Sequence, residues 1–471
     1  MAAGVLDRLR RIVGPAHVLT EQDDGDLSAW TLDWRRRYRG RALAVVRPGN
    51  TEEVAAVLAL ASELGVAVVP QGGNTGLVGG GVPDASGTQM LLSMQRLNRI
   101  RGIDAANLTL TAEAGCILQA VQQAAEAAGL MFPLSLAAEG SCTIGGNLAT
   151  NAGGTQVLRW GNARELCLGL EFVTSQGRIW HGLTGLRKDN TGYDLRDLFI
   201  GSEGTLGVIT AATMKLAPQP AAVCTALVAC ADLPAAVALL ELSRRMLGDG
   251  LSGFEVMNVL SRRLVARHFP NLPQPLPDAS WSVLLEYSSS EGEAHGRGRF
   301  ETLLGAALER GIALDAVIAA SLAQTRALWH LRESIPLAQA EEGPNIKHDI
   351  SLPVSAVPSF VAECDAALQC GWPGVGVVDF GHLGDGNLHY NVQAPSGTPG
   401  SEFLRAHEKA INASVFDLVA RHGGSFSAEH GIGALKRDEL ATRKDPVALA
   451  LMRSIKSALD PLGILNPGRV L

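Results

Sequence analysis

The sequence predicts a protein of mixed α and β structure with two or three domains. Its 471 residues are more than one compact hydrophobic core usually holds. Residues 42–217 alternate helix and strand patterns, and residues 375–393 have the pattern of a β-hairpin. Pro218-Gln219-Pro220 lies between these regions, and two prolines so close together predict a domain boundary.

The first region is expected to begin with a helix and to continue with short apolar strands. Thr51 is expected to cap the helix, because the two glutamates after it favour the positive end of the helix dipole. Gly65 is expected to end it, since glycine readily adopts the left-handed conformation common at helix ends. The other elements expected here are strands at 66–70, 90–94 and 108–115 and an amphipathic helix at 117–129.

Three loops of the first region are rich in Gly, Asn, Thr and Ser: residues 71–76, 140–154 and 201–210. Glycine lets the backbone approach a bulky ligand, and the exposed N–H groups of such loops can hold phosphate oxygens. Each loop could be an ordinary turn, and one such loop would be uninformative, whereas three, each beside an expected strand, favour a large phosphate-bearing cofactor. The chain has no P-loop motif, and its G-x-G-x-x-G at 248–253 precedes a strand-like segment, so the cofactor fold is expected not to be a Rossmann fold.

The second region is expected to open with a strand and to contain the hairpin. A proline-rich stretch at 270–280 is not expected to form regular structure. The other expected elements are a strand at 223–230, a long helix at about 315–340, a helix at 402–421 and a glycine-bearing tail that ends in a helix and a turn.

The segment GHLGDGNLH within the hairpin is the most informative in the chain. Asp385-Gly386 is a favoured two-residue loop, and a hairpin centred there places His382 opposite His389. Their Cβ atoms would lie about 5 Å apart on one face, which suits two imidazoles that bind one metal ion. Asn391 is expected on the same face. From this segment alone, a metal-binding pair and a pair of hydrogen-bonded histidines both remain open.

The composition is that of a soluble globular protein. Apolar residues make up 46% of the chain and charged residues 18%, and the net charge of −7 gives no basic footprint for nucleic acid. Seven scattered cysteines without a C-x-x-C pair indicate reduced thiols. The N-terminal sequence lacks the apolar run of a signal peptide, and no apolar stretch reaches the roughly 18 residues that span a bilayer. We therefore expect a cytoplasmic location and leave peripheral membrane contact open.

Seven motifs, in the same order, resemble one flavoprotein family. They are PQGGNTGLVGG (70–80), GSCTIGGNLATNAGG (140–154), LRKDNTGYDLRDLFIGSEGTLGVIT (186–210), LRES (331–334), GHLGDGNLH (381–389), SAEHGIG (427–433) and GILNPGR (463–469). The family is that of the FAD-linked D-2-hydroxyacid dehydrogenases in the vanillyl-alcohol oxidase superfamily. The D-2-hydroxyglutarate dehydrogenases look most similar, with D-lactate dehydrogenase and the glycolate oxidase FAD subunit as relatives. The resemblance extends from about residue 40 to the end of the chain.

The resemblance implies an α+β fold in three functional segments. Residues 1–217 would form a vanillyl-alcohol-oxidase-type FAD-binding domain. Residues 218–424 would form an α+β substrate and metal (cap) domain with an antiparallel sheet. Residues 425–471 would form a helical C-terminal segment that returns to the FAD domain.

The resemblance also implies which residues bind FAD. The first loop contains neither histidine nor cysteine, so we expect the FAD to be bound non-covalently. The implied contacts are Pro70, Gln71, Gly72, Gly73, Asn74, Thr75, Gly76, Leu77, Gly140, Ser141, Gly145, Gly146, Asn147, Thr150, Asn151, Gly153, Gly204, Ile209 and Asn466.

A metal site and a base follow from the same resemblance. His382, His389 and Glu429 match the family's metal ligands, with zinc the first expectation and manganese or cobalt also suitable. His430 matches the family's general base. The metal would lower the pKa of the substrate's 2-hydroxyl, His430 would take its proton, and the C2 hydride would pass to flavin N5. The expected product is the 2-oxoacid.

Arg332, Lys347 and Asn391 match the positions that bind substrate. Arginine can grip a carboxylate with two hydrogen bonds. The alternative for Arg332 is an ordinary ion pair on a surface helix, with Glu333 or Glu341. Pro336 stands where hydroxyglutarate enzymes can place a threonine, so D-2-hydroxyglutarate, D-lactate and related acids all remain candidate substrates.

Three other functions remain as alternatives to the dehydrogenase. They are a redox-neutral flavin transferase of the alkyl-glycerone-phosphate synthase type, a flavin-free metal hydrolase and a non-catalytic binding subunit. A dehydrogenase of this kind needs an electron acceptor, such as an electron-transfer flavoprotein or a quinone. A homodimer is also expected to be compatible with the family.

Overall fold

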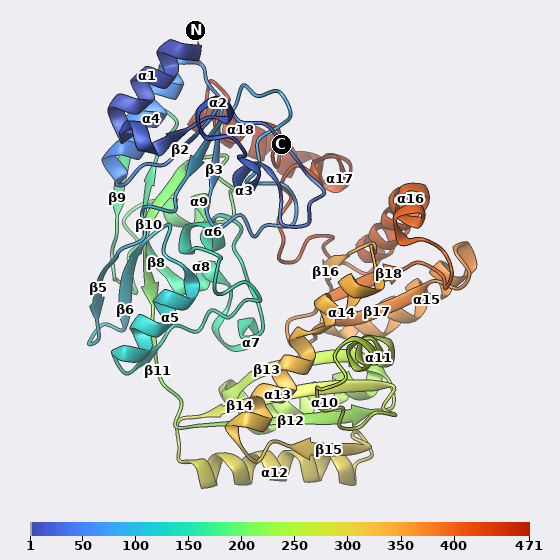
Figure 1. Ribbon diagram of the computed structural model, residues 1–471. Helices are drawn as coiled ribbons and strands as arrows, with labels where there is room; N and C mark the ends of the chain where they lie inside the picture. The colour runs from blue at the N-terminus through green and yellow to red at the C-terminus, as the bar shows by residue number, and fades with distance from the viewer. Residues whose placement is uncertain (1) are drawn as a thin grey trace. The chain divides into compact units, whose positions relative to one another are not determined.

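The computed structural model describes residues 2–471, which form two compact units (Figure 1). The first unit contains the residues up to Gly153, Gly161–Gln219 and Glu429–Leu471, and the second contains Gly154–Trp160 and Pro220–Ala428. Both units combine helices with sheets, so the predicted α+β class is confirmed. The predicted division into three functional segments stays a prediction.

A four-stranded sheet in the first unit has the order β1-β2-β4-β3. Strands β2, β4 and β3 run parallel, and β1 is antiparallel to β2. The strands are β1 (Val18–Leu19), β2 (Ala44–Val46), β3 (Val68–Gln71) and β4 (Met90–Ser93). Helix α4 (Thr51–Leu64) connects β2 to β3, which run in the same direction on either side of β4, and it buries its apolar side in the same core as these strands.

Helix α4 ends at Gly65 as predicted, with that glycine in the left-handed conformation (φ 64°). The prediction that Thr51 caps this helix is wrong. Asn50 is the N-cap, because its side chain accepts the N–H of Glu53 at 2.8 Å. Thr51 lies inside the helix, where its hydroxyl donates to Glu171 at 2.7 Å. Both residue types are good caps, so the choice between these neighbours depends on a buried partner far along the chain.

A second sheet in the first unit is antiparallel throughout, with the order β5-β6-β10-β8-β9. The strand predicted at 108–115 is β6, and the helix predicted after it is α5 (Leu118–Ala127). A small sheet pairs β7 (Leu130–Met131) with β11 (Ala217–Pro218). The strands of the larger sheet are β5 (Ile100–Asp104), β6 (Thr109–Glu113), β8 (Cys167–Val173), β9 (Ile179–Gly182) and β10 (Val208–Lys215).

The C-terminal tail completes the first unit. Leu465 forms a parallel bridge with Val68, and the N–H of Asn466 donates to the Val68 carbonyl at 2.8 Å, so the tail extends the edge of β3 (Figure 1). The predicted helical tail consists of α17 (Arg437–Arg443) and α18 (Pro446–Leu459). The other helical segments of this unit are α1 (Ala2–Val13), a 3-10 turn at Pro15–His17, α2 (Glu21–Asp24), α3 (Ser28–Thr31), α6 (Ile144–Ala149), α8 (Ala163–Leu166) and α9 (Leu195–Phe199).

The second unit is built on one seven-stranded sheet of order β15-β12-β14-β13-β17-β18-β16. Every neighbouring pair is antiparallel, which confirms the predicted antiparallel sheet. The strands are β12 (Ala222–Cys230), β13 (Leu251–Asn258), β14 (Trp281–Ser289), β15 (Asp315–Ile318), β16 (Asp349–Ser351), β17 (Gly376–His382) and β18 (Asn387–Gln393).

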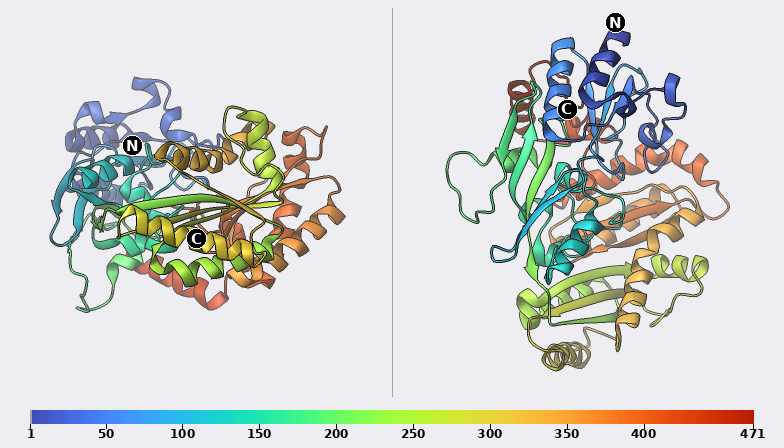
Figure 2. Two further views of the ribbon diagram at one scale, coloured as in Figure 1. Left: turned by 90° about the horizontal axis from the view of Figure 1, so that it is seen from below. Right: turned by 60° about the vertical axis from the view of Figure 1, so that its left-hand side comes forward.

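Helices cover both faces of this sheet (Figure 2). Along β13, Phe254 and Val256 belong to one core, and Met257 belongs to a second core on the opposite face. The first core also contains residues of α10 (Leu233–Leu247), α12 (Glu293–Glu309), α15 (Val357–Gly371) and α16 (Gly400–Arg421). The second core contains residues of α11 (Val259–His268), α13 (Leu322–Glu333) and α14 (Ile335–Glu342). Short helical turns complete the unit at α7 (Val157–Trp160), Gly248–Gly250 and Val354–Ala356.

The prediction of a single helix at about 315–340 is wrong. Its first residues form β15, which pairs with β12, and the remainder is two helices that meet at Ser334. Pro336 lies in the first turn of α14, where its missing N–H costs no hydrogen bond. Proline disfavours a helix that continues through it, which is consistent with the break at Ser334. The apolar periodicity continues across this break and therefore did not reveal it.

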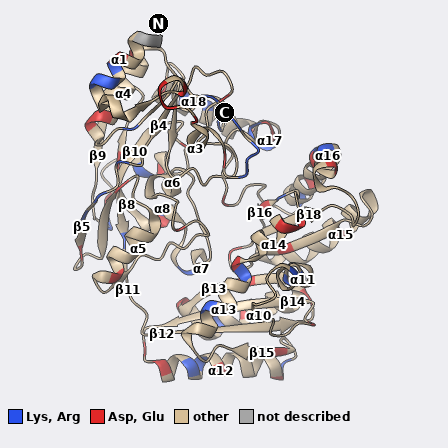
Figure 3. Cartoon of the chain, in the orientation of Figure 1, with Lys and Arg blue, Asp and Glu red and all other residues tan. Residues whose placement is uncertain are grey.

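Within residues 2–471, no helix is both long and apolar enough to cross a membrane. All seven cysteines are free thiols, as predicted. Lys and Arg are interspersed with Asp and Glu over both units (Figure 3). The cytoplasmic location stays a prediction.

Candidate functional site

The hairpin of β17 and β18 forms as predicted, but its predicted register is wrong. Phe380 lies opposite His389, and the four residues after His382 form the connection. The two-residue loop favoured by an Asp-Gly pair needs positive φ at both central residues. Of Asp385 and Gly386, only Gly386 has positive φ (83°).

The contacts of Asn387 explain the longer loop. Its side-chain amide donates to the Asp349 carboxylate at 3.0 Å and to the Ile350 carbonyl at 2.9 Å. Asn387 therefore belongs to the pairing between β18 and β16 and is not available to close a tight turn. Neither contact could be read from the hairpin sequence, since both partners lie on another strand.

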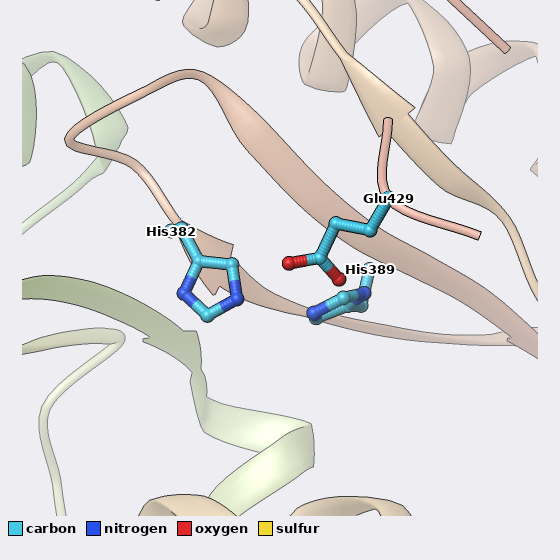
Figure 4. Close-up of side chains that lie close together, drawn as sticks. All are labelled: His382, His389 and Glu429. Carbon is cyan, nitrogen blue, oxygen red and sulfur yellow. The ribbon is translucent and has the colours of Figure 1, made fainter. Parts of the chain in front are cut away.

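The three predicted metal ligands lie together despite the shifted register. The rings of His382 and His389 have centroids 5.5 Å apart and planes at 80°. One ligand atom from each histidine and one carboxylate oxygen of Glu429 lie within 4.8 Å of one another, and Figure 4 shows the carboxylate beside both rings. Glu429 directly follows Ala428, whose N–H donates to the Asp349 carbonyl at 3.2 Å. Two imidazoles and one carboxylate are a donor set that fits zinc, manganese or cobalt, without fixing which ion.

Glu255 is a buried carboxylate of this site that no motif marks. It lies opposite His382 on β13, and its Oε1 is 2.6 Å from Nδ1 of His382. Its Oε2 accepts a hydrogen bond from Nε of Arg332 at 2.8 Å and forms an ion pair with Nη2, also at 2.8 Å. Burial raises the pKa of Glu255, but His382 and Arg332 outweigh it and lower that pKa to about 2, so the group is ionised. The one sequence signal is a charged residue inside the apolar strand GFEVM.

Arg332 is buried, so its interpretation as part of a surface helix ion pair is wrong. Its side chain is 7% exposed, and its partner is Glu255 on the sheet. The guanidinium carbon lies 4.8 Å from the ring centroid of Phe380. Within residues 2–471, Nη1 makes no hydrogen bond, so this nitrogen can still donate to a ligand.

Asn391 and Lys347 lie near the same face of the sheet. The Asn391 amide donates to Oε1 of Gln339 at 2.9 Å, and its oxygen accepts the N–H of His348 at 3.2 Å. The protein therefore holds both ends of this amide. Lys347 immediately precedes His348 and is half-buried. The substrate-binding roles of Arg332, Lys347 and Asn391 stay predictions.

His430 lies beside the predicted metal ligands. One of its ring nitrogens and carboxylate oxygens of Asp349 and Glu429 lie within 4.8 Å of one another. Asp349 is also the strand partner of His389, so the four groups gather around one corner of β16 and β18. The predicted base is thus placed next to the predicted ligands, and its role as a base stays a prediction.

The candidate FAD loops in the first unit are brought together by glycines. A Cβ on Gly72 would lie 2.3 Å from the Thr143 hydroxyl, and a Cβ on Gly73 would lie 1.9 Å from the Ser141 carbonyl oxygen. Only glycine allows this approach, so the first two predicted loops lie against each other. The second stretch also contains a helix, α6, because Thr143 caps it by accepting the N–H of Gly146. The glycine-rich pattern did not reveal that helix.

Two buried amides connect these loops with the C-terminal tail. Nε2 of Gln71 donates to two backbone carbonyls, and Nδ2 of Asn466 donates to the carbonyls of Gly80 and Glu203. In the part of the chain that the structure describes, Oε1 of Gln71 and Oδ1 of Asn466 are buried without a hydrogen-bond partner. Such acceptors fit a cofactor that brings its own donors, so the residues present suit FAD.

The other predicted FAD contacts lie in the same loops. Asn74 and Asn151 have positive φ (55° and 50°), a conformation that asparagine tolerates. Gly204 also has positive φ (70°), and a Cβ there would lie 3.0 Å from Cγ of Pro70. Ile209 is buried on β10. The individual FAD contacts stay predictions.

Two family models match consecutive parts of the chain. Residues 42–182 match an FAD binding domain, and residues 219–470 match the C-terminal domain of FAD linked oxidases. The FAD-binding half and the second half identified by motifs therefore both have counterparts among known proteins.

Full-length relatives match along nearly the whole chain. A mitochondrial D-2-hydroxyglutarate dehydrogenase of Bos taurus is 41% identical over 466 residues, which covers 99% of this chain and 83% of the relative. A D-2-hydroxyglutarate dehydrogenase of Xanthomonas citri pv. viticola is 40% identical and covers 95% and 93%. Among solved structures, p-cresol methylhydroxylase with bound substrate has a TM-score of 0.78 at 17% identity, covering 99% of this chain and 96% of the other. That last likeness concerns the fold alone.

Proposed function

The chain belongs to the family of FAD-linked oxidases, and from this premise we propose that it oxidises a D-2-hydroxyacid to the 2-oxoacid with FAD and a divalent metal. It is an FAD-dependent oxidoreductase similar to D-2-hydroxyglutarate dehydrogenase. The observation that carries the finer proposal is the convergence of His382, His389 and Glu429 within 4.8 Å. Three protein ligands leave coordination positions open for substrate oxygens, as catalytic metal sites do.

The chemistry requires removal of a proton before hydride transfer. A divalent metal bound to the three ligands would lower the pKa of the substrate's 2-hydroxyl. His430, which follows Glu429 in the chain, would take the hydroxyl proton as general base. Loss of that proton makes C2 a better hydride donor, since an incipient alkoxide donates hydride more readily than an alcohol. Bound FAD would supply the hydride acceptor at its N5 atom.

Substrate carboxylates would be held by cations on the same face of the sheet. Arg332 offers Nη1, because Glu255 holds its Nε and Nη2. Lys347 would add a second charge and Asn391 a polar contact. D-2-hydroxyglutarate is the first candidate because two relatives at about 40% identity are named for it. D-lactate remains the second candidate, since Pro336 removes a hydroxyl that could bind a distal carboxylate.

The flavin must be reoxidised after each turnover. We propose a separate acceptor for this step, of the electron-transfer flavoprotein or quinone type. We also propose that the protein forms a homodimer.

Anaerobic reduction of the flavin tests the proposed function. The purified protein is mixed with D- and L-enantiomers of 2-hydroxyglutarate and lactate, before and after metal removal with a chelator. We expect the visible flavin absorption to bleach with a D-acid only. This bleaching should no longer occur after chelation, and it should return when zinc, manganese or cobalt is added. Absence of bleaching by every D-acid would overturn the dehydrogenase, and full bleaching after verified metal removal would overturn the role of the metal.

A further inference from the structure

Glu255 contacts both a proposed metal ligand and the proposed substrate arginine, and neither the motifs nor the comparisons assign it a role. We infer that Glu255 is a positioning residue whose two carboxylate oxygens hold His382 for the metal and Arg332 for the substrate. This inference rests on the proposed function, because it concerns the same site. A single buried group would thereby link metal binding to substrate binding.

The contact with His382 fixes the state of the imidazole. A carboxylate can only accept hydrogen bonds, so the 2.6 Å contact places the proton on Nδ1. In the neutral, metal-binding form of the ring the lone pair is then on Nε2, on the opposite side of the ring, where it can bind a metal. A carboxylate that orients a metal-binding histidine in this way also makes it a stronger ligand.

The contact with Arg332 fixes the plane of the guanidinium. Nε donates to Oε2 of Glu255, Nη2 forms an ion pair with the same oxygen, and the ring of Phe380 lies beside the guanidinium carbon. A planar group held by two of its nitrogens and by an aromatic ring keeps its third nitrogen, Nη1, in one direction. The substrate carboxylate would therefore meet a donor that is already oriented.

The register of the sheet makes this double contact possible. Glu255 and His382 are direct partners on β13 and β17, and Arg332 reaches them from α13, which covers the same face. The Glu255 side chain is 1% exposed, so both contacts are shielded from water and from salt.

Glu286 provides a matched control on the neighbouring strand β14. It is also buried, but its carboxylate accepts from the Trp329 ring nitrogen (2.8 Å) and the Ser252 hydroxyl (2.9 Å). It contacts neither His382 nor Arg332 within residues 2–471. Replacement of Glu286 therefore perturbs a buried carboxylate of the same sheet without touching the proposed link.

Zinc affinity is the first readout, because it does not depend on turnover. The FAD-containing protein is stripped of metal and titrated with zinc against a competing chromophoric chelator. For Glu255→Gln we expect zinc affinity to fall about 10- to 100-fold, the loss typical of removing a partner of a metal-binding histidine. For Glu286→Gln we expect the wild-type affinity. Equal zinc affinity in Glu255→Gln and wild type would overturn the inference.

A second pair of variants covers a failure of Glu255→Gln to fold, since that change leaves the Arg332 charge buried without its carboxylate. Arg332→Met removes the charge and keeps the contact between Glu255 and His382. Glu255→Leu combined with Arg332→Met removes both charges and fills the space with apolar groups. We expect Arg332→Met to bind zinc like wild type and to raise KM, and the double variant to bind zinc about 10- to 100-fold more weakly than Arg332→Met. Equal zinc affinity of these two variants would overturn the inference.

The outcomes separate this inference from the proposed function. If the wild-type protein binds neither zinc, manganese nor cobalt, the proposed metal chemistry fails and the inference fails with it. If wild type binds zinc and bleaches with a D-acid while Glu255 variants keep full zinc affinity, only the inference fails. The inference is supported if the Glu255 variants bind zinc more weakly, with normal FAD content, while Glu286→Gln and Arg332→Met bind zinc like wild type.

Discussion

The side-chain amide of Asn466 donates to the backbone carbonyl of Glu203 at 2.8 Å, across more than 260 positions of sequence. The same amide donates to the Gly80 carbonyl at 3.0 Å. Asn466 also holds a positive φ of 43°. One residue thereby connects the C-terminal tail to two of the loops that are predicted to bind FAD.

Two substitutions at Asn466 separate its hydrogen bonds from its backbone conformation. Asn466→Ala removes both donors and should lower the free energy of unfolding by about 2–3 kcal/mol, because two carbonyls lose their partners. Asn466→Gly removes the same donors, but glycine adopts positive φ without strain. We expect the glycine variant to be about 1 kcal/mol more stable than the alanine variant in urea unfolding. Equal stability of the two would contradict a strained backbone at this position.

Asp379 should make the second unit sensitive to pH. In the described residues both of its carboxylate oxygens are buried without hydrogen-bond partners. Burial, helped by nearby Asp365, raises the pKa of Asp379 well above its usual value, and Tyr390 and Cys364 are its other titratable neighbours. A carboxyl with a raised folded-state pKa stabilises the fold below its unfolded pKa, and this contribution is lost as pH rises through the folded pKa.

Asp379→Asn removes the titration while nearly keeping the side-chain volume. We expect the stability of the variant relative to wild type to increase as the pH rises from acidic to alkaline. Urea unfolding at a series of pH values measures this difference directly. A difference that does not change with pH would show that Asp379 does not titrate in this range.

The sequence predicts a structural feature well when the residues that determine it are neighbours in the chain. It predicts the feature poorly when a contact with a residue far along the chain determines it. The existence of the hairpin followed from the Asp385-Gly386 pair, a favoured turn sequence, but its register depends on Asn387, whose partners are on another strand. Glycine at position 65 ends its helix through a local preference, whereas Thr51 loses the cap to Asn50 because its hydroxyl has a buried partner elsewhere.

In the candidate site, too, some residues are revealed by local sequence and others by contacts far along the chain. Family motifs contain His382, His389 and Glu429, and the structure brings these three together. Glu255 is in no motif, and its importance depends on a strand pairing over 127 positions. Arg332 was recognisable as a candidate, but its burial against Glu255 was not, because helical periodicity says nothing about a partner on a sheet.

Pro336 is expected to limit the use of a diacid substrate. Pro336→Thr adds the hydroxyl that the family resemblance implies at this position in hydroxyglutarate enzymes, and we expect it to lower KM for D-2-hydroxyglutarate relative to D-lactate. Pro336→Val is the matched control, because valine has the shape of threonine without the hydroxyl. A single hydrogen bond to a charged group corresponds to about 1.5–3 kcal/mol, or roughly tenfold or more in KM. The same KM ratio in both variants would exclude this hydroxyl as a selectivity determinant.

Lys347 is expected to hold a distal carboxylate. Lys347→Ala should raise KM for D-2-hydroxyglutarate about tenfold or more, and KM for D-lactate less, with little change in kcat. The reason is that an interaction made equally in ground and transition states affects binding alone. Steady-state kinetics with both acids measure the effect, and Lys347→Arg keeps the charge as a control. If both substrates are affected alike, Lys347 does not bind the distal carboxylate.

Glu429 and His430 are adjacent in sequence, yet we expect their substitutions to fail in different ways. Glu429→Gln removes one of the three proposed metal ligands and should abolish tight zinc binding, and activity with it. His430→Asn leaves the ligands in place, so zinc and FAD should bind normally while kcat falls by about 10²- to 10⁴-fold, the usual contribution of a general base. Because the base acts on the hydroxyl proton, the loss in His430→Asn should diminish as the pH is raised and hydroxide competes for that proton. Zinc titration and the pH profile of kcat distinguish the two roles, and a loss of zinc binding in His430→Asn would reassign His430 to the metal.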